Sequence, residues 1–118
     1  MTKLRSYRDL HVWMKSMQLV EKVYLETKNF PADEKYTLTS QIRRSAISIP
    51  SNIAEGQGRN TDGEFLQFLG IASGSLSELE TQIELSVRLG YMPNDTALNL
   101  MCDEVGKMLT GLIKSIKK

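Results

Sequence analysis

Residues 41–56 read QIRRSAISIPSNIAEG, and this stretch decides the fold that the sequence predicts. Within this stretch, and in the three residues before it, apolar residues recur at steps of three and four, which is typical of one buried face of an α-helix. This face consists of Leu38, Ile42, Ala46, Ile49 and Ile53. Pro50 disturbs the helix, because it has no N–H and its ring crowds the carbonyl of Ala46. Since the apolar spacing continues past it and glycine stop signals come only at Gly56 and Gly58, we predict one helix that is kinked at Pro50.

The polar residues around the proline are predicted to have a structural role. Ser48, Ser51 and Asn52 are placed to hydrogen-bond the carbonyl that the proline leaves unpaired. We interpret Glu55 as a hydrogen-bond acceptor that is partly buried against the following loop, and catalysis by its carboxylate is the alternative. The predicted structural motif consists of Pro50, Asn52, Glu55 and Gly56.

Three more amphipathic helices are predicted, so we expect an all-α, antiparallel, up-down-up-down four-helix bundle. The helices are expected at about residues 9–28, 32–55, 62–89 and 94–117. Start signals are expected at each helix. They are the N-caps Asp9, Thr61 (with Glu64 three residues later) and Asn94 or Asp95, and Pro31 in the first turn of the second helix. In the first helix the main apolar stripe is expected at Leu10, Trp13, Met17, Val20 and Tyr24, widened by Val12, Leu19 and Val23.

The third predicted helix has a nearly heptad apolar seam and two internal glycines. The seam consists of Phe65, Leu69, Ala72, Leu76, Leu79, Ile83 and Ser86. Gly70 and Gly74 together cost a helix about 2 kcal/mol relative to alanine, which close approach of another backbone would offset. Phe68 and Leu85 lie off the seam, where they either widen the core or contact a neighbouring subunit. Gly70, Gly74, Phe68 and Leu85 are therefore the candidate oligomer interface.

Length and composition predict one domain over residues 1–118. A single cysteine, Cys102, cannot form an internal disulfide, which favours a reducing, cytoplasmic setting. The first thirteen residues carry charges throughout and do not resemble a secretory signal. No stretch approaches the roughly 18 apolar residues of a membrane span.

The net charge of +1 is low for a nucleic-acid binder, but the basic residues are clustered. Both termini of an up-down bundle lie at one end, where six cations would form a basic patch or serve only as solubilising tails. These six are Lys3, Arg5, Arg8, Lys114, Lys117 and Lys118. Arg43 and Arg44 are candidates for phosphate contact, and ion pairs with carboxylates of a neighbouring helix are the alternative. Arg59, in a glycine-containing connection, is a further candidate contact.

No catalytic or metal-binding motif is present. The sequence has no HExxH and no Glu-x-x-His pair, and its only histidine, His11, has no second histidine as a partner. We therefore predict no catalytic residue, no cofactor, no metal and no small-molecule substrate.

Residues 48–56, SIPSNIAEG, resemble the hallmark stretch of the 23S ribosomal RNA intervening-sequence proteins. The resemblance extends from about Tyr7 to Ile113; it includes residues 10–13, 30–34, 41–44, 74–79 and 89–91. It implies a four-helix bundle that assembles as a symmetric homopentamer with a central channel. The family is associated with open reading frames inserted in 23S ribosomal RNA genes. It is similar to the accessory variability determinant of diversity-generating retroelements, a basic bundle that engages a reverse transcriptase and nucleic acid; this chain departs from that pattern in being nearly neutral.

The resulting hypothesis is a non-enzymatic, cytoplasmic, homo-oligomeric scaffold that binds RNA or an RNA-handling protein. A protein–protein adaptor without nucleic-acid contact is the alternative. A pentamer would repeat each local basic patch five times around one rim, which matters more for attracting a polyanion than the net charge does.

Overall fold

The computed structural model describes residues 6–118 and contains four α-helices and two short 3₁₀ helices. The elements in chain order are η1 (Tyr7–Asp9), α1 (His11–Glu26), η2 (Ala32–Glu34), α2 (Leu38–Gln57), α3 (Asp62–Arg88) and α4 (Thr96–Ile116). The described part of the chain has no strand, so the predicted all-α class is confirmed.

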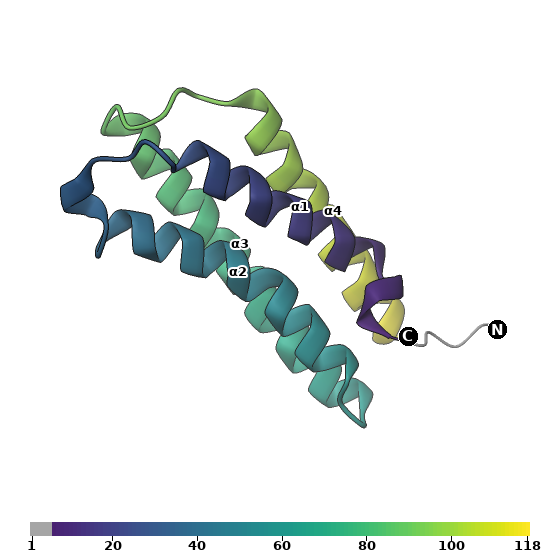
Figure 1. The fold of residues 1–118 in the computed structure, drawn as a ribbon. Helices are drawn as coiled ribbons and strands as arrows, with labels where there is room; N and C mark the ends of the chain where they lie inside the picture. Colours follow the sequence, from purple (N-terminus) through teal and green to yellow (C-terminus); the bar gives the residue numbers. More distant parts are fainter. Residues whose placement is uncertain (1–5) are drawn as a thin grey trace.

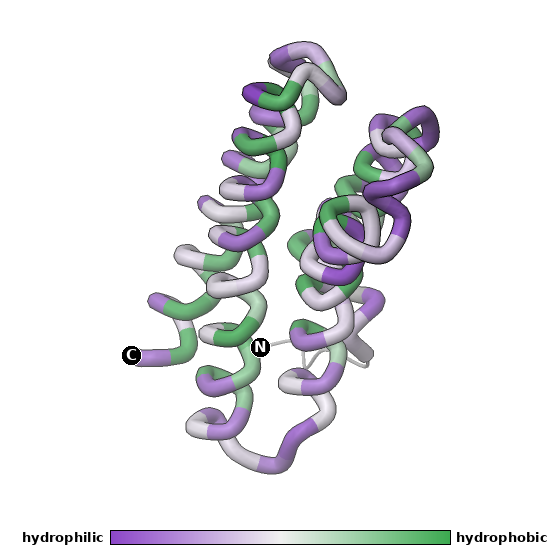
Figure 2. Tube along the Cα trace, turned by 90° about the vertical axis from the view of Figure 1, so that its left-hand side faces the viewer, coloured by the Kyte–Doolittle hydropathy of each residue, from purple (hydrophilic) through white to green (hydrophobic). Residues whose placement is uncertain are grey.

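The helices form two layers, α1 with α2 and α3 with α4 (Figures 1 and 2). Each helix packs against the next one in the chain, α4 also packs against α1, and the closest packing is between α2 and α3. The α1–α2 and α3–α4 connections lie at one end of the molecule, and the α2–α3 turn lies at the other (Figure 1). In Figure 2 the hydrophobic positions of both layers are turned toward the space between them. These contacts are those of a helical bundle.

The core confirms the predicted apolar faces of α2 and α3. All five predicted positions of α2 are buried, and so are all those of the α3 seam except Phe65, which is partly buried against the core. Ser75 adds a hydroxyl to this interior and lies 2.8 Å from the hydroxyl of Ser48 on α2. The α2–α3 contact therefore combines apolar packing with one hydroxyl pair.

The predicted stripe of α1 is correct in part. Leu10 is buried, and so are Val12, Leu19 and Val23, which were expected to widen the stripe. The main-stripe residues Met17 and Tyr24 are instead 41% and 40% exposed, and Ser16 is buried in their place. The hydroxyl of Ser16 donates to the carbonyl of Trp13 at 2.9 Å, so this polar residue is satisfied in the core. Because a serine occupies a core position, the apolar pattern places the centre of the buried face on the neighbouring row through Met17, whereas the structure places it on the row of Ser16.

The second helix begins later than the predicted residue 32, and its N-cap is Thr37. Residues 32–34 form the separate 3₁₀ helix η2. The carboxylate of Glu34 accepts hydrogen bonds from the hydroxyl of Thr37 and, at 2.8 Å, from that of Tyr91 beyond α3. It also accepts from the N–H of Leu38 at 3.4 Å. Glu34 thus caps α2 from outside the helix instead of forming part of its first turn.

The second helix continues through Pro50 and past Gly56, which had been predicted as a stop signal, to Gln57. Gly56 is buried where α2 approaches α3: a Cβ atom added to it would lie 2.7 Å from the Cβ of Phe68 and 3.0 Å from Cδ1 of Phe65. This glycine is therefore required by close packing, not by helix termination.

The caps of α3 and α4 follow local signals. Thr61 Oγ1 accepts from the N–H of Glu64 at 3.1 Å, and Asp95 accepts from the N–H groups of Ala97 and Leu98 at 2.9 and 3.2 Å. Gly90, with φ of 79°, has the left-handed conformation that a glycine commonly adopts just beyond a helix end.

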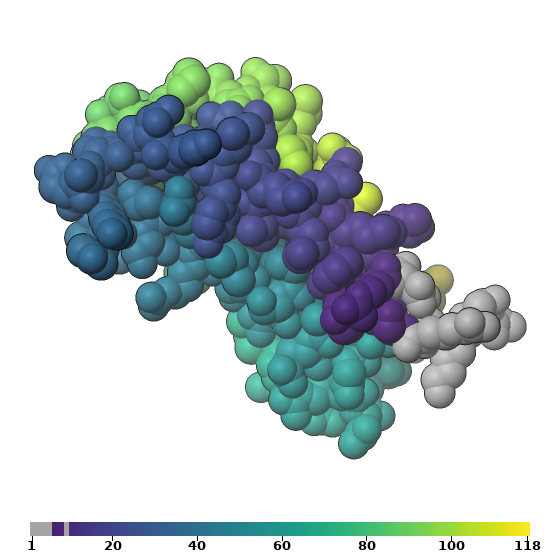
Figure 3. Space-filling view, viewed as in Figure 1, coloured from purple at the N-terminus to yellow at the C-terminus, as the bar shows by residue number. Residues whose placement is uncertain are grey.

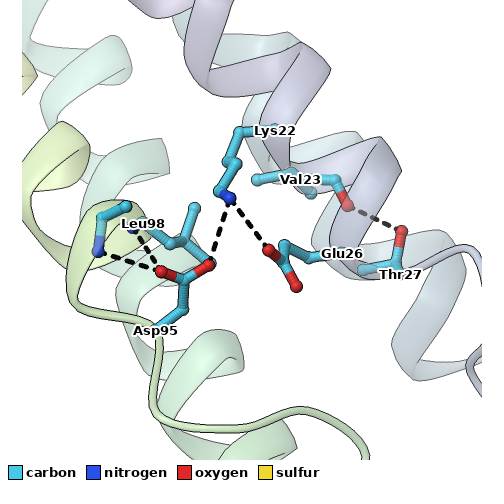
Figure 4. A network of polar contacts seen from close by, with 7 residues as sticks. Lys22, Val23, Glu26, Thr27, Asp95 and Leu98 are labelled. Carbon is cyan, nitrogen blue, oxygen red and sulfur yellow. Dashed lines mark hydrogen bonds and ion pairs between the residues drawn. The ribbon is translucent and has the colours of Figure 1, made fainter.

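A polar network joins the end of α1 to the start of α4 (Figure 4). Lys22 Nζ lies 3.0 Å from Glu26 and 3.3 Å from Asp95, and both carboxylates raise the pKa of the ammonium group. Contact with Glu26, then the N–H of Leu98 and the charge of Lys22, hold the pKa of Asp95 below its usual range despite partial burial. The N-cap of α4 is thereby fixed to α1.

Candidate nucleic-acid and assembly surfaces

The candidate basic residues do not form one cluster. Lys3 and Arg5 lie outside the described residues, Arg8 is exposed beside the ring of Tyr7, and Lys114, Lys117 and Lys118 are exposed at the end of α4. Arg43 instead contacts the far end of α1, which at 1.5 Å per residue lies about 24 Å from its start. The structure therefore separates Arg43 and Arg44 from the basic residues at the chain ends.

Arg43 forms no ion pair within residues 6–118. Its Nε donates to the hydroxyl of Thr27 at 2.9 Å, and its guanidinium carbon lies 4.5 Å from the centre of the Tyr24 ring. Arg44 is exposed on the next position of α2, also without an ion pair in the described part of the chain. The alternative, ion pairs with carboxylates of a neighbouring helix, is therefore not observed among residues 6–118, and both positive charges remain available.

Arg59 is neutralised within the subunit. It lies 2.9 Å from Glu55 and 4.0 Å from Glu64, and its guanidinium covers the ring of Phe68 at 4.8 Å. Glu55 is half-exposed, so its observed contact is this surface ion pair. Of the predicted cations, Arg59 is thus the least suited to bind a phosphate.

The side chain of Asn52 forms hydrogen bonds with the preceding turn of α2. Its amide donates to the carbonyl and to the hydroxyl of Ser48 at 2.8 and 2.9 Å. Within the described residues, no side chain hydrogen-bonds the carbonyl of Ala46, so the expected compensation at that group is not observed. Asn52 therefore supports the α2–α3 hydroxyl pair of Ser48 and Ser75.

The outer face of α3 is open. Gly70 and Gly74 are exposed, and a Cβ atom added to either would meet nothing within 4 Å. Ile71 and Leu85 lie on the same outward face at helical spacing and are both 45% exposed. Phe68 lies on the opposite side, against Gly56, and so is separated from the other three candidate interface residues.

A second apolar surface was missed by the sequence analysis. The row of α1 that was mistaken for core faces α2 across a groove of about 340 Å³. Trp13, Met17 and Val20 line it from α1, and Ile47, Pro50 and Ala54 line it from α2. Two apolar rows on one helix were the available signal, because a helix with a single buried face needs only one.

The ionisable groups in the interior do not suggest catalysis. Burial, with the nearby Glu80 and Asp103, raises the pKa of the Cys102 thiol to about 12, which keeps it protonated at neutral pH. Within residues 6–118, no group of three or more His, Cys, Asp or Glu side chains could hold a metal ion. The described helices include none that is long and apolar enough to cross a membrane.

Together these features define a small all-α bundle with an apolar groove, an open helix face and two separate basic regions. The chain belongs to the 23S rRNA-intervening sequence protein family, whose model matches residues 8–111, which confirms the resemblance seen in SIPSNIAEG. A similar solved structure is that of a protein of unknown function from the S23 ribosomal protein family of Bacteroides thetaiotaomicron. The two chains are 28% identical, with a TM-score of 0.77 over 87% of this chain and 98% of that one. No curated protein matches the chain.

Proposed function

We propose that this protein is a non-enzymatic scaffold that assembles with copies of itself and binds RNA or an RNA-handling protein. The observation that carries the proposal is the open outer face of α3, where Gly70 and Gly74 allow another backbone to approach beside Ile71 and Leu85. Helix-interior glycines are unfavourable unless something offsets their cost, and no contact among residues 6–118 does so at these two positions. The family resemblance favours a pentamer as the assembled form.

Unpaired cations support the RNA component of the proposal. Arg43 and Arg44 are free of carboxylate partners in the described chain, as are Arg8 and Lys114. Assembly repeats each of these positions, so a ring of nearly neutral subunits presents several local basic regions to a polyanion. The family's description as 23S rRNA-intervening sequence proteins agrees with an RNA-related role.

The finer features of the fold belong to the same proposal. We take the bundle to be antiparallel and up-down-up-down, with α2 bent at Pro50, so that Pro50 shapes the wall of the apolar groove. The buried, protonated thiol of Cys102 is compatible with a reducing, cytoplasmic setting.

The molar mass of the untagged protein tests the assembly. We expect light scattering after size-exclusion chromatography to give about five times the chain mass of 13.3 kDa. Gly74→Leu should lower this mass, because a large side chain blocks close approach. Gly111→Leu on α4 is the matched control, since Gly111 also has nothing within 4 Å of an added Cβ. A wild-type mass of one chain, or an equal effect of both variants, would contradict assembly through α3.

A protein–protein adaptor without RNA contact is the second candidate, favoured by the net charge of only +1. The apolar groove between α1 and α2 would then be its main binding surface. Titration of the assembled protein with single-stranded and double-stranded RNA distinguishes the two. Salt-dependent binding supports the RNA scaffold, and absence of binding at low salt leaves the adaptor.

A further inference from the structure

Two adjoining hollows lie where α1 leads into α2. This part of the chain is toward the left of Figure 3. The volumes of the two hollows are about 460 and 200 Å³, and both are lined by Lys35, Thr39 and Arg43. We call them together the cationic pocket; its principal residues are Lys28, Lys35, Tyr36, Thr39, Arg43 and Arg44. The pocket is built by the last turn of α1, the following connection and the first turns of α2.

The charge of the cationic pocket is all of one sign. Four cations line it, and neither hollow has an Asp or Glu in its wall. None of the four forms an ion pair among residues 6–118, in contrast to Lys22, Arg59 and Arg88. Like charges held together without a counter-charge attract an anion, most strongly in a concave site.

Arg43 is already oriented for such an anion. Thr27, which is buried, accepts from Nε, and the Tyr24 ring supports the face of the guanidinium. These two contacts leave the terminal N–H groups of the guanidinium as donors. Because the side chain is partly buried and held in place, less rotamer freedom is lost when a phosphate binds.

Thr39 provides a polar group that the subunit does not satisfy. Its Oγ1 is buried and has no hydrogen-bond partner, although the residue lines both hollows. Thr39 and Ser40 also lie in the first turn of α2, where the helix dipole favours negative charge. A phosphate in the pocket would therefore lie where the field of the helix adds to that of the cations.

Tyr36 adds an aromatic surface at the edge of the pocket. It is 85% exposed, with the ammonium of Lys35 5.4 Å from its ring centre. Cations beside an exposed ring are the arrangement by which proteins bind single strands, since the phosphate meets the cations and an unpaired base stacks on the ring. A double helix does not offer a free base face.

We infer that the cationic pocket binds single-stranded RNA, with one backbone phosphate at Arg43, Arg44 and Lys35 and an adjacent base on Tyr36. This inference rests on the proposed RNA function and specifies its site and strand preference. The contact is to phosphate and base face, so recognition has little sequence dependence.

Fluorescence anisotropy with a labelled oligouridine of about twelve nucleotides tests this inference on the full chain. Tyr36→Ala should raise Kd at least about fivefold, whereas Tyr36→Phe, which keeps the ring, should not. Arg44→Gln should reduce the slope of log affinity against log salt by about 0.7. Lys107→Gln removes an exposed, unpaired cation on α4 and is the charge-matched control.

Each outcome assigns success or failure to a particular claim. Suppose that the wild type binds RNA, but that Lys107→Gln weakens RNA binding as much as Arg44→Gln does, or that Tyr36→Ala leaves Kd unchanged. Either result would show that the cationic pocket is not the binding site, while the proposed RNA scaffold would still stand. If duplex RNA binds as tightly as the single strand, the stacking on Tyr36 is wrong. If inorganic phosphate competes as strongly as the strand, the pocket is a simple anion site. If the wild type binds no RNA, the proposed RNA function fails with it.

Discussion

Gly56 of α2 lies directly against Phe68 of α3, with only 2.7 Å between the Cβ of Phe68 and the position of a Cβ on Gly56. Cβ atoms in proteins do not approach each other this closely, so the two helices can pack together here only if residue 56 of α2 has no side chain. Gly56 was predicted as a helix stop, yet it determines how closely α2 and α3 approach each other.

Gly56→Ala should destabilise the protein by about 1–3 kcal/mol, because the added methyl group forces α2 and α3 apart. Urea unfolding at a fixed protein concentration measures the loss. Gly111→Ala is the control: its Cβ enters open space, and alanine in place of a helical glycine should stabilise by about 1 kcal/mol. Equal changes in the two variants would contradict the packing role of Gly56.

The hydrogen bonds to Glu34 should make stability depend on pH. The hydroxyls of Thr37 and then Tyr91 lower the pKa of the carboxyl from its ordinary 4.5. A lowered pKa in the folded state stabilises the fold above about pH 4.5, and this contribution is lost as the pH falls through the folded-state value. Tyr91→Phe keeps the ring contact with Phe30 but removes one donor, so variant and wild type should differ in stability at pH 7 and converge in acid.

Urea unfolding of both proteins between pH 7 and pH 3 checks this behaviour. Tyr36→Phe serves as the control, since Tyr36 is exposed and its hydroxyl is not among the hydrogen-bond donors to Glu34. A difference between Tyr91→Phe and wild type that stays constant over the whole pH range would show that Tyr91 does not act through the ionisation of Glu34.

Asp95→Ala should cost about 1–2 kcal/mol, because two N–H groups of α4 lose their acceptor and Lys22 loses a partner. Asn94→Ala, one residue earlier, removes only an exposed side-chain hydrogen bond to Asn99 and should change stability by less than about 0.5 kcal/mol. Denaturant midpoints of the two variants give the comparison; similar values would mean that the cap contributes little.

Pro50→Ala tests whether a bend in α2 shapes the assembled form. Alanine restores an N–H toward the carbonyl of Ala46, so circular dichroism should show undiminished helix content. We expect the molar mass by light scattering to fall, because α2 packs extensively against α3 and a straighter α2 shifts the proposed assembly face of α3. An unchanged mass would show that Pro50 has no role in assembly.

Local patterns predicted the elements well where every signal lay in one segment. The α3 seam is apolar at nearly every core position and is preceded by Thr61, so both the helix and its face were correct. In α1, Ser16 occupies the core and Met17 does not, and only packing against α2 and α4 decides between two adjacent rows. Helix periodicity carries no information about that choice.

The start of α2 and the cationic pocket depend on contacts between distant residues. Glu34 accepts a hydrogen bond from Tyr91, 57 positions further along the chain. The residues near Glu34 in the sequence therefore could not indicate that it lies outside α2. Arg43 and Arg44 were predicted from the sequence as phosphate contacts. The way α1 packs against α2 determines two further features: Tyr24 and Thr27 support Arg43, and the pocket wall contains no carboxylate. Composition alone, with a net charge of +1, gave no indication of a pocket with four cations.

The chain ends and the α1–α2 connection lie at opposite ends of the molecule, and this separation has a practical consequence. The short helix η1 and the end of α4 lie at the end of the molecule with the α2–α3 turn, and the α1–α2 connection, which carries Tyr36, lies at the other (Figure 1). A biosensor chip, fluorophore or fused reporter attached at either terminus would therefore leave Tyr36 and its neighbouring cations facing solution. Surface-immobilised protein can thus be compared with free protein without the tether obstructing the pocket.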